Sequence, residues 1–114
     1  MVEDYYDARW AVRELLVSDG FHVDEARNGK EALDFLLSRE TPALIVLTRE
    51  TPVMSGTELL ERMKSYERLA GVPVILLSAY ERPPKDEQIV AFFTKPCDFE
   101  ALSQAVRRHA RLPN

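Results

Sequence analysis

The sequence predicts an α/β fold in which helices cover both faces of a parallel sheet. Segments with helical spacing of apolar residues alternate along the chain with short apolar runs. Two of those runs, residues 43–47 and 74–77, contain no polar residue, which is typical of strands covered on both faces. Strands that alternate with helices are joined by right-handed crossovers, and these crossovers make the strands parallel.

The first forty residues are expected to form two helices with a strand between them. Residues 6–19 carry apolar side chains at helical spacing, and Gly20 follows where the helix would stop. Residues 21–26 alternate in part and lead into the turn signal Asn28-Gly29, so we expect a strand there. Apolar residues between 32 and 37 then mark a second helix.

The remaining elements continue the alternation. After the strand at 43–47, a third helical stripe is made by Leu59, Leu60, Met63 and Tyr66. A strand at 74–77 and an apolar, β-branched and aromatic run at 89–94 follow. The final helix begins after Asp98, a residue type that often caps helices.

The chain has the length of one such domain. Its 114 residues suffice to bury about two-thirds of the unfolded surface in a single core. No linker, internal repeat or low-complexity segment divides the sequence. We therefore expect one domain over residues 1–114.

Composition excludes several classes of partner. Fifteen basic and nineteen acidic residues give a net charge of −4, so neither nucleic acid nor a membrane surface is expected to bind. The apolar runs are far shorter than a bilayer span. A single cysteine, Cys97, and the absence of a signal-peptide pattern favour the cytoplasm.

Polar residues follow the predicted strands at the edge where such folds place their sites. Glu3 and Asp4 follow the first two residues, Thr48 follows the run ending at Leu47, and Ser78 and Lys95 follow the last two strands. Ligands of open α/β sheets bind outside the carboxyl ends of the strands. The convergence of these side chains therefore predicts a polar site, although none of them is specific alone.

Several motifs occur in a fixed order along essentially the whole chain: Val2-Glu3-Asp4 with Arg9, Asn28-Gly29-Lys30-Glu31-Ala32-Leu33, Leu44 to Leu47 running into Pro52-Val53-Met54-Ser55-Gly56, Ser78-Ala79, and Thr94-Lys95-Pro96. With them the sequence resembles the receiver domain of two-component response regulators, the CheY-like family. The resemblance implies a flavodoxin-like (βα)5 three-layer sandwich with strand order 2-1-3-4-5. It also implies phosphorelay signalling, in which a histidine kinase phosphorylates an aspartate at the end of strand three with the help of Mg²⁺.

The same resemblance implies roles for individual residues. Glu3 and Asp4 match the acidic pair that binds Mg²⁺, and Glu50 matches the residue whose backbone carbonyl is a further metal ligand. Ser78 matches the hydroxyl that hydrogen-bonds the phosphoryl group, and Lys95 matches the lysine that pairs with it. The peptide bond between Lys95 and Pro96 is expected to be cis.

The sequence departs from the family at its centre, because Thr48 occupies the position of the acceptor aspartate. A threonine hydroxyl is a weak nucleophile unless a base activates it, and a neutral ligand also weakens a Mg²⁺ site. We therefore expect a pseudo-receiver, a non-enzymatic protein-interaction module whose partner is a histidine kinase or an output protein. We expect it to be a monomer or a weak dimer. The alternative is a domain that still accepts a phosphoryl group, with Mg²⁺, on Asp4 or Glu50.

Two elements are expected to be reduced. Only Met1 and Val2 precede the acidic pair, yet order 2-1-3-4-5 places this strand inside the sheet, where unpaired backbone groups are costly. The chain should therefore lack residues upstream of Met1 or have a sheet weakened at strand one. Between Ser78 and Lys95 the chain is short and contains Pro83-Pro84, so the fourth helix should be a stub or absent.

Overall fold

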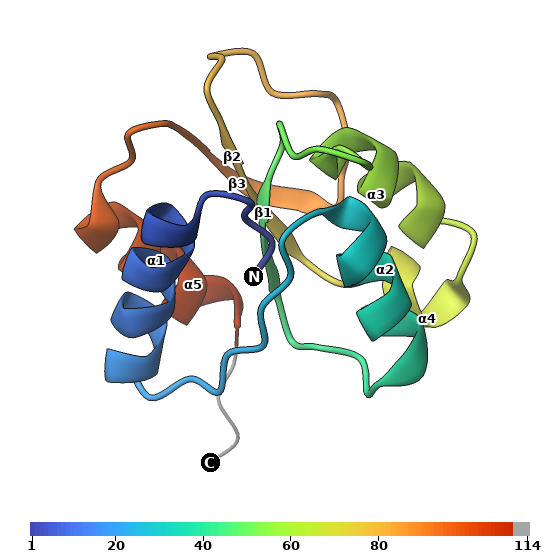
Figure 1. Ribbon diagram of the computed structural model, residues 1–114, viewed down its shortest axis with the longest axis horizontal. Coiled ribbons are helices and arrows are strands. Elements are labelled where there is room, and N and C mark those ends of the chain that lie inside the picture. Colours follow the sequence, from blue (N-terminus) through green and yellow to red (C-terminus); the bar gives the residue numbers. More distant parts are fainter. Residues whose placement is uncertain (111–114) are drawn as a thin grey trace.

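A parallel three-stranded sheet forms the centre of the computed structural model, which describes residues 1–110 (Figure 1). The strands β1 (Ile45–Thr48), β2 (Val74–Ser78) and β3 (Ile89–Thr94) lie side by side in that order. Every residue of β1 and β2 is buried, as their apolar runs predict. β3 is only partly buried and lies at the edge of the sheet. Residues 111–114 of the predicted domain lie outside the described residues.

The first two predicted strands are reduced to single bridges. Val2 pairs with Ala26 on one side and with Leu47 of β1 on the other, both in parallel. The sheet therefore has the predicted order 2-1-3-4-5, with a very short first strand. The predicted strand at 21–26 is wrong except at Ala26, because residues 21–25 have no neighbouring strand with which to pair among residues 1–110.

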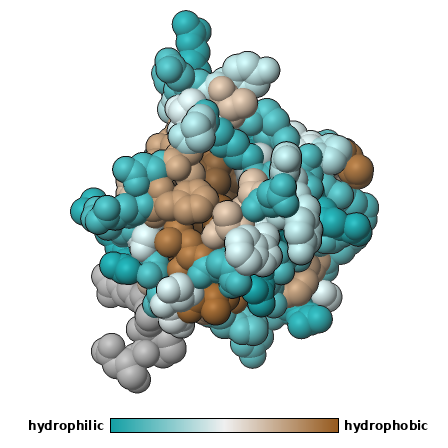
Figure 2. All heavy atoms as spheres, turned by 60° about the vertical axis from the view of Figure 1, so that its left-hand side comes forward, coloured by the Kyte–Doolittle hydropathy of each residue, from teal (hydrophilic) through white to brown (hydrophobic). Residues whose placement is uncertain are grey.

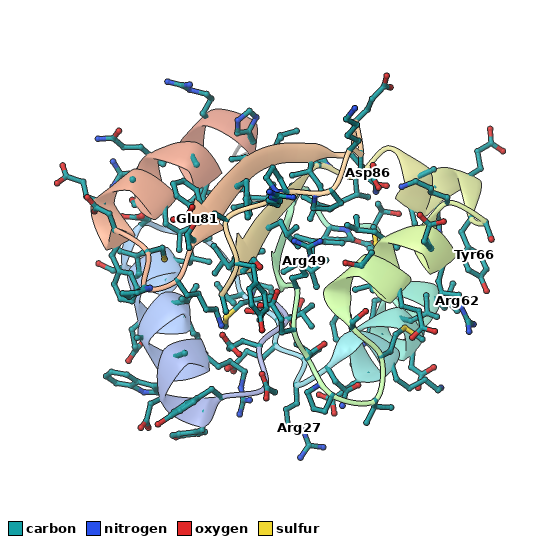
Figure 3. All side chains as sticks on the ribbon, turned by 90° about the horizontal axis from the view of Figure 1, so that it is seen from above. Arg27, Arg49, Arg62, Tyr66, Glu81 and Asp86 are labelled. Carbon is teal, nitrogen blue, oxygen red and sulfur yellow. The ribbon has the colours of Figure 1, made fainter. Side chains whose placement is uncertain are left out.

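Helices cover both faces of the sheet, as predicted. α1 (Tyr6–Ser18) and α5 (Phe99–His109) pack on the face that carries Val46, Ile75 and Leu77. α2 (Gly29–Ser38), α3 (Gly56–Met63) and the short α4 (Glu67–Ala70) lie on the opposite face, with the alternate strand residues (Figures 1 and 3). Figure 2 looks onto the α1 and α5 side, where apolar residues gather between polar margins.

Local signals explain most helix ends. The Asp98 side chain accepts hydrogen bonds from the N–H groups of Glu100 and Ala101, which caps α5 as predicted. After α1, Gly20 has a φ of 94°, a conformation that favours glycine. The predicted third helix is too long, because α3 ends at Met63 and Tyr66 precedes α4 with 40% of its surface exposed.

A loop replaces the fourth helix of the family. Residues 79–88 contain only bends, a turn and irregular structure, which confirms the reduced element that Pro83-Pro84 predicts. The Arg49 guanidinium donates a hydrogen bond of 2.5 Å to the carbonyl of Arg82, and Figure 3 shows Arg49 beside this loop. The loop is thus fixed to the segment that follows β1. No helix among residues 1–110 is long and apolar enough to cross a bilayer.

Candidate functional site

Three segments that are distant in sequence meet at the buried carboxylate of Glu3. Glu3 directly follows the Val2 bridge, Thr48 ends β1, and Lys95 follows β3. The Thr48 hydroxyl donates a hydrogen bond of 3.0 Å to Oε1 of Glu3. The Lys95 ammonium forms an ion pair with the same oxygen. One carboxylate therefore binds the polar side chains of two other strand ends.

The second oxygen of Glu3 is also engaged, and this fixes the charge of the carboxylate. The N–H of Tyr5 donates to Oε2 of Glu3 at 3.1 Å. Burial opposes ionisation, but the hydrogen bonds from Lys95 and Tyr5 outweigh it, so the pKa of Glu3 is lowered. Partial burial and the neighbouring Glu3 carboxylate raise the pKa of the more exposed Asp4. Glu3 is thus the stable anion of the pair.

A second carboxylate occupies the end of β2. The Ser78 hydroxyl donates a hydrogen bond of 2.6 Å to Oε2 of Glu50, and the N–H of Ala79 donates to Oε1 at 2.8 Å. The hydroxyl of Ser78 also accepts from the N–H of Tyr80 at 3.1 Å. A hydroxyl and a backbone N–H side by side form a seat for one anion, and here the side chain of Glu50 fills it.

Glycine allows the loop after β1 to hold these positions. A Cβ at Gly56, the first residue of α3, would lie 2.6 Å from the carbonyl oxygen of Thr48 and 2.9 Å from Cα of Arg49. The N–H of Gly56 donates a hydrogen bond of 2.7 Å to the carbonyl of Arg49. The start of α3 therefore packs directly against the backbone that carries Thr48 and Glu50.

The site residues predicted from the sequence lie at this edge in two groups. The structure brings Thr48 and Lys95 together on Glu3, places Ser78 with Glu50, and leaves Asp4 exposed beside them. The peptide bond between Lys95 and Pro96 is cis, as expected. The sequence predicted a backbone role for Glu50 and, as an alternative, a role of its carboxylate as phosphoryl acceptor, but not the hydrogen bonds of this carboxylate with Ser78 and Ala79. The one available signal was a carboxylate two residues beyond a strand end.

The carboxylates at this edge contact the protein's own donors. Among residues 1–110, no three His, Cys, Asp or Glu side chains gather in a group that could hold a metal ion. Glu3 faces Lys95 and Thr48, and Glu50 faces Ser78. The arrangement can hold the strand ends together and can bind an anion at the seat of Ser78 and Ala79 if Glu50 leaves it.

A parallel sheet in this order, with hydroxyl, lysine and acidic groups gathered at the carboxyl ends of its strands, is the arrangement of a flavodoxin-like α/β domain. The model of the family described as "Response regulator receiver domain" matches residues 1–107. The chain therefore belongs to the response regulator receiver family.

Relatives with known names cover most of the chain. "Sporulation initiation phosphotransferase F" of Bacillus subtilis is 31% identical over 117 residues, which is 98% of this chain and 92% of that protein. "Polar-differentiation response regulator DivK" of Brucella anthropi is 30% identical and aligns over 85% of this chain and 82% of its own. These similarities identify this chain as the receiver domain of a two-component response regulator.

Solved structures show the same fold. The signal receiver domain of a histidine kinase from Syntrophus aciditrophicus has a TM-score of 0.84 and 31% identity, covering 99% of this chain and 92% of its own. The response regulator TrrA of Thermotoga maritima, solved in complex with Mg²⁺ and BeF, has a TM-score of 0.80 and 28% identity, covering 94% and 93%.

Proposed function

We propose that this domain is a pseudo-receiver, a protein-binding module of a two-component pathway that has no catalytic activity and accepts no phosphoryl group. The observation that carries the proposal is Thr48, which directly follows Leu47 at the end of β1, where the family places its acceptor aspartate. A threonine presents a neutral hydroxyl in place of a nucleophilic carboxylate.

The surroundings of Thr48 do not activate it. Its hydroxyl donates to Glu3, but the ion pair with Lys95 helps to lower the pKa of Glu3, which makes this carboxylate a poor base. The two histidines lie elsewhere: His22 pairs with Asp24 on an exposed segment, and His109 is the last residue of α5. Nothing at the site prepares the hydroxyl for attack on a phosphoryl donor.

Glu50 supports the same proposal, because it occupies the residues that would bind a phosphoryl group. In the family, the hydroxyl matched by Ser78 binds the phosphoryl group. Here that hydroxyl and the N–H of Ala79 already hold a carboxylate. A phosphoryl group would have to displace Glu50. Because Glu50 already binds Ser78 and Ala79, we propose that the loop after β2 keeps this arrangement without phosphorylation.

The residues present fit Mg²⁺ poorly. This hard cation requires octahedral oxygen ligands and is usually held by one or two carboxylates together with substrate phosphate. Glu3 is committed to Lys95, a hydroxyl replaces the carboxylate at position 48, and Asp4 alone remains exposed to solvent. We propose that Mg²⁺ binds weakly and takes no part in the function.

The proposed partners are signalling proteins, either a histidine kinase or an output protein of the pathway. Without phosphorylation, binding must depend on a constant surface. On this surface, the loop at 79–88 stands where the family has a helix. Partner contacts that relatives make through that helix are therefore not proposed for this chain.

Incubation with acetyl phosphate and Mg²⁺, followed by intact mass spectrometry, tests the proposal. We expect no phosphoryl adduct on the wild-type chain. A Thr48→Asp variant should gain an adduct that hydroxylamine removes, because it restores the carboxylate beside Lys95. Thr48→Ser is the matched control and should remain unmodified. A labile adduct on the wild-type chain at substantial occupancy would overturn the proposal.

Two further arms separate the alternatives. Peptide mapping of any adduct shows whether Asp4 or Glu50 has replaced the acceptor, which is the competing hypothesis. In the Thr48→Asp background, Glu50→Gln removes the charge from the seat of Ser78 and Ala79. We expect this double variant to take up the phosphoryl group faster than Thr48→Asp alone.

A further inference from the structure

Apolar side chains are exposed along the outer side of α1, which lies at the left side of the molecule in Figure 1. Tyr6 is 66% exposed, Trp10 is 52% exposed and Val17 is 42% exposed. The same helix buries Val12 and Leu16 in the core, so its apolar residues serve two sides. A tryptophan and a tyrosine exposed together on one helix are typical of an interaction surface.

A basic residue completes this exposed row. Arg13 lies between Trp10 and Val17 on the same side of the helix, and its side chain is 40% exposed. Tyr6, Trp10, Arg13 and Val17 follow one another at intervals of four, three and four residues, which is the spacing with which one helix packs along another. These four residues are called the α1 stripe below.

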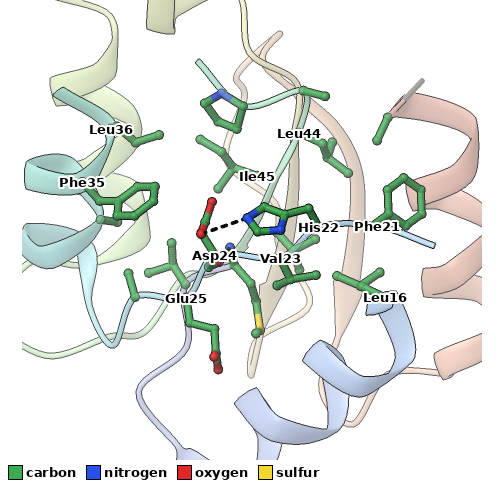
Figure 4. Close-up of a pocket in the computed structure, with 18 of the residues that line it drawn as sticks. Leu16, Phe21, His22, Val23, Asp24, Glu25, Phe35, Leu36, Leu44 and Ile45 are labelled. Carbon is green, nitrogen blue, oxygen red and sulfur yellow. Dashed lines mark hydrogen bonds and ion pairs between the residues drawn. The ribbon is translucent and has the colours of Figure 1, made fainter. Parts of the chain in front are cut away.

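Ion pairs fix the base of the α1 stripe. The guanidinium of Arg9 lies 5.5 Å from the centre of the Tyr6 ring and pairs with Oε1 of Glu25 at 3.4 Å. Nε of Arg13 pairs with Oε2 of Glu25 at 3.3 Å. Figure 4 shows the side chains of Glu25 and Asp24 pointing in opposite directions, which leaves the Glu25 carboxylate to these two arginines. Side chains that are already ordered lose less entropy when a partner binds.

The order of residues in the α1 stripe fits a second copy of the same helix. In an antiparallel pair with two-fold symmetry, Tyr6 of one copy faces Val17 of the second copy, and Trp10 faces Arg13. Each contact occurs twice. The first joins two apolar side chains, and the second places a guanidinium against an indole, the ring that attracts cations most strongly. The α1 stripe therefore complements itself.

We propose that two copies of the chain associate through antiparallel α1 helices, with the α1 stripe at the centre of the interface. The 13 residues of α1 extend over only about 20 Å. Such a contact buries less than the roughly 1,200 Å² of a stable complex, so the dissociation constant should be on the order of 100 µM. The interface uses none of the residues that gather at Glu3 and holds whether or not the domain accepts a phosphoryl group.

Like charges beside the α1 stripe limit this affinity. Asp7 and Glu14 are exposed and directly follow Tyr6 and Arg13, so they lie on one flank of the stripe. In the antiparallel pair this flank faces the same flank of the other helix, which brings Asp7 near Glu14 of the second copy. Their repulsion can be tested by substitution of an exposed residue.

Sedimentation from about 10 µM to about 1 mM measures the association. We expect a reversible dimer, and the indole N–H signal of Trp10, the single tryptophan of the chain, should shift along the same concentration curve. Trp10→Ala should weaken dimerisation at least about tenfold, because it removes both contacts with Arg13. Leu37→Ala, which removes a 40% exposed apolar side chain from α2, is the matched control and should leave dimerisation unchanged.

Glu14→Lys is expected to have the opposite effect. It places a cation near Asp7 of the second copy and should tighten dimerisation about fivefold. Glu61→Lys makes the same change of net charge at an exposed position of α3 and is its matched control. Because Glu14 is exposed, this comparison gives the answer even if Trp10→Ala folds poorly.

Four results would overturn the proposal. A chain that stays monomeric at about 1 mM would leave the α1 stripe to a different partner. A Trp10 signal that does not change with concentration would place the interface on another surface. Dimerisation that Trp10→Ala leaves intact would show that the stripe contributes nothing. Equal effects of Glu14→Lys and Glu61→Lys would exclude the antiparallel arrangement.

Discussion

A single buried carboxylate holds together the end of the Val2 bridge, the end of β1 and the residue after β3. The side chain of Glu3 is 5% exposed and that of Lys95 is 31% exposed, so their ion pair is screened far less than a surface pair. Thr48 adds a hydrogen bond that an acceptor aspartate, as an anion beside another anion, would not donate. The threonine is therefore compatible with a locked arrangement of the strand ends.

Replacing Lys95 by methionine should reveal the strength of this lock. The pKa of Glu3 is lowered in the folded chain, so its contribution is fully present above the unfolded pKa of about 4.5 and is lost as the pH falls through the folded pKa. Without Lys95, the hydrogen bonds from Tyr5 and Thr48 remain as the main opposition to burial, so we expect the folded pKa of Glu3 to rise. We expect Lys95→Met to lower the free energy of unfolding by about 3 kcal/mol at pH 7. This difference from the wild-type chain should become smaller as the pH falls to 5.

Urea unfolding at pH 5 and pH 7 measures both effects. Lys30→Met is the matched control, because Lys30 pairs with Asp34 on an exposed helix surface and its loss should cost less than about 0.5 kcal/mol. A Glu3→Gln and Lys95→Met double variant should recover part of the loss, since no uncompensated charge then remains buried. Equal losses of unfolding free energy for Lys95→Met and Lys30→Met would show that the buried ion pair of Lys95 and Glu3 stabilises the fold no more than an exposed one.

Among the elements, α3 depends most closely on the segment after β1. Gly56 begins this helix where a Cβ would meet the backbone of Thr48 and Arg49, whereas a Cβ at Gly71, after α4, would meet nothing within 4 Å. The residue type is the same at both positions, but only a side chain at Gly56 would meet other backbone atoms. The comparison separates helix propensity from packing.

Substitution of each glycine by alanine should therefore have opposite effects. Alanine favours a helix over glycine by about 1 kcal/mol, but at Gly56 the contact with backbone atoms forces α3 away and should cost about 2 kcal/mol net. Gly71→Ala should be neutral or slightly stabilising. Thermal unfolding of both variants provides the measurement. A neutral Gly56→Ala variant would mean that the segment carrying Thr48 moves readily.

The elements also show how far sequence patterns reach. The buried runs of β1 and β2, the cap at Asp98 and the loop around Pro83-Pro84 were predictable because each depends on residues close together in the chain. The convergence of Thr48 and Lys95 followed from the rule for strand ends. The strand predicted at 21–26 failed because a strand also needs a neighbour. The hydrogen bonds of the Glu50 side chain were not predicted because its partners, Ser78 at the end of β2 and Ala79 just after it, are 28 and 29 residues away.

For the molecule as a whole, the carboxyl and amino ends of the strands differ in how completely their polar groups are paired. At the carboxyl edge, Glu3 and Glu50 have donors from other segments, and the backbone after β1 is held by α3. At the opposite end of the strands, the N–H of Val46 has no hydrogen-bond partner among residues 1–110, and the buried amino group of Met1 donates to the carbonyl of Asp24. Stability should therefore respond to chemistry at Met1, far from the site.

The amino group of Met1 makes this response measurable. Burial lowers its pKa from 8.0 to about 6, with the nearby charges of Asp24 and Glu25 opposing the shift. Between these values the unfolded chain binds more protons than the folded chain, so stability should rise with pH, by about 2 kcal/mol between pH 6 and pH 8 and by up to about 2.7 kcal/mol over the whole titration. Above pH 8 both states are neutral, and the penalty for burying the charge is gone.

Acetylation of Met1 should abolish this pH dependence and stabilise the chain at pH 6. It removes the charge but retains one N–H for the carbonyl of Asp24, and the acetyl carbonyl takes the position from which a preceding residue would accept the N–H of Val46. Urea unfolding of acetylated and free chains at pH 6 and pH 8 provides the test, and the difference between the two chains cancels contributions that both chains share. Parallel pH profiles for the two chains would contradict the burial of this amino group. A gain at pH 8 well above the roughly 0.4 kcal/mol that the half-protonated amino group of the unfolded chain accounts for would indicate that the acetyl carbonyl pairs with Val46.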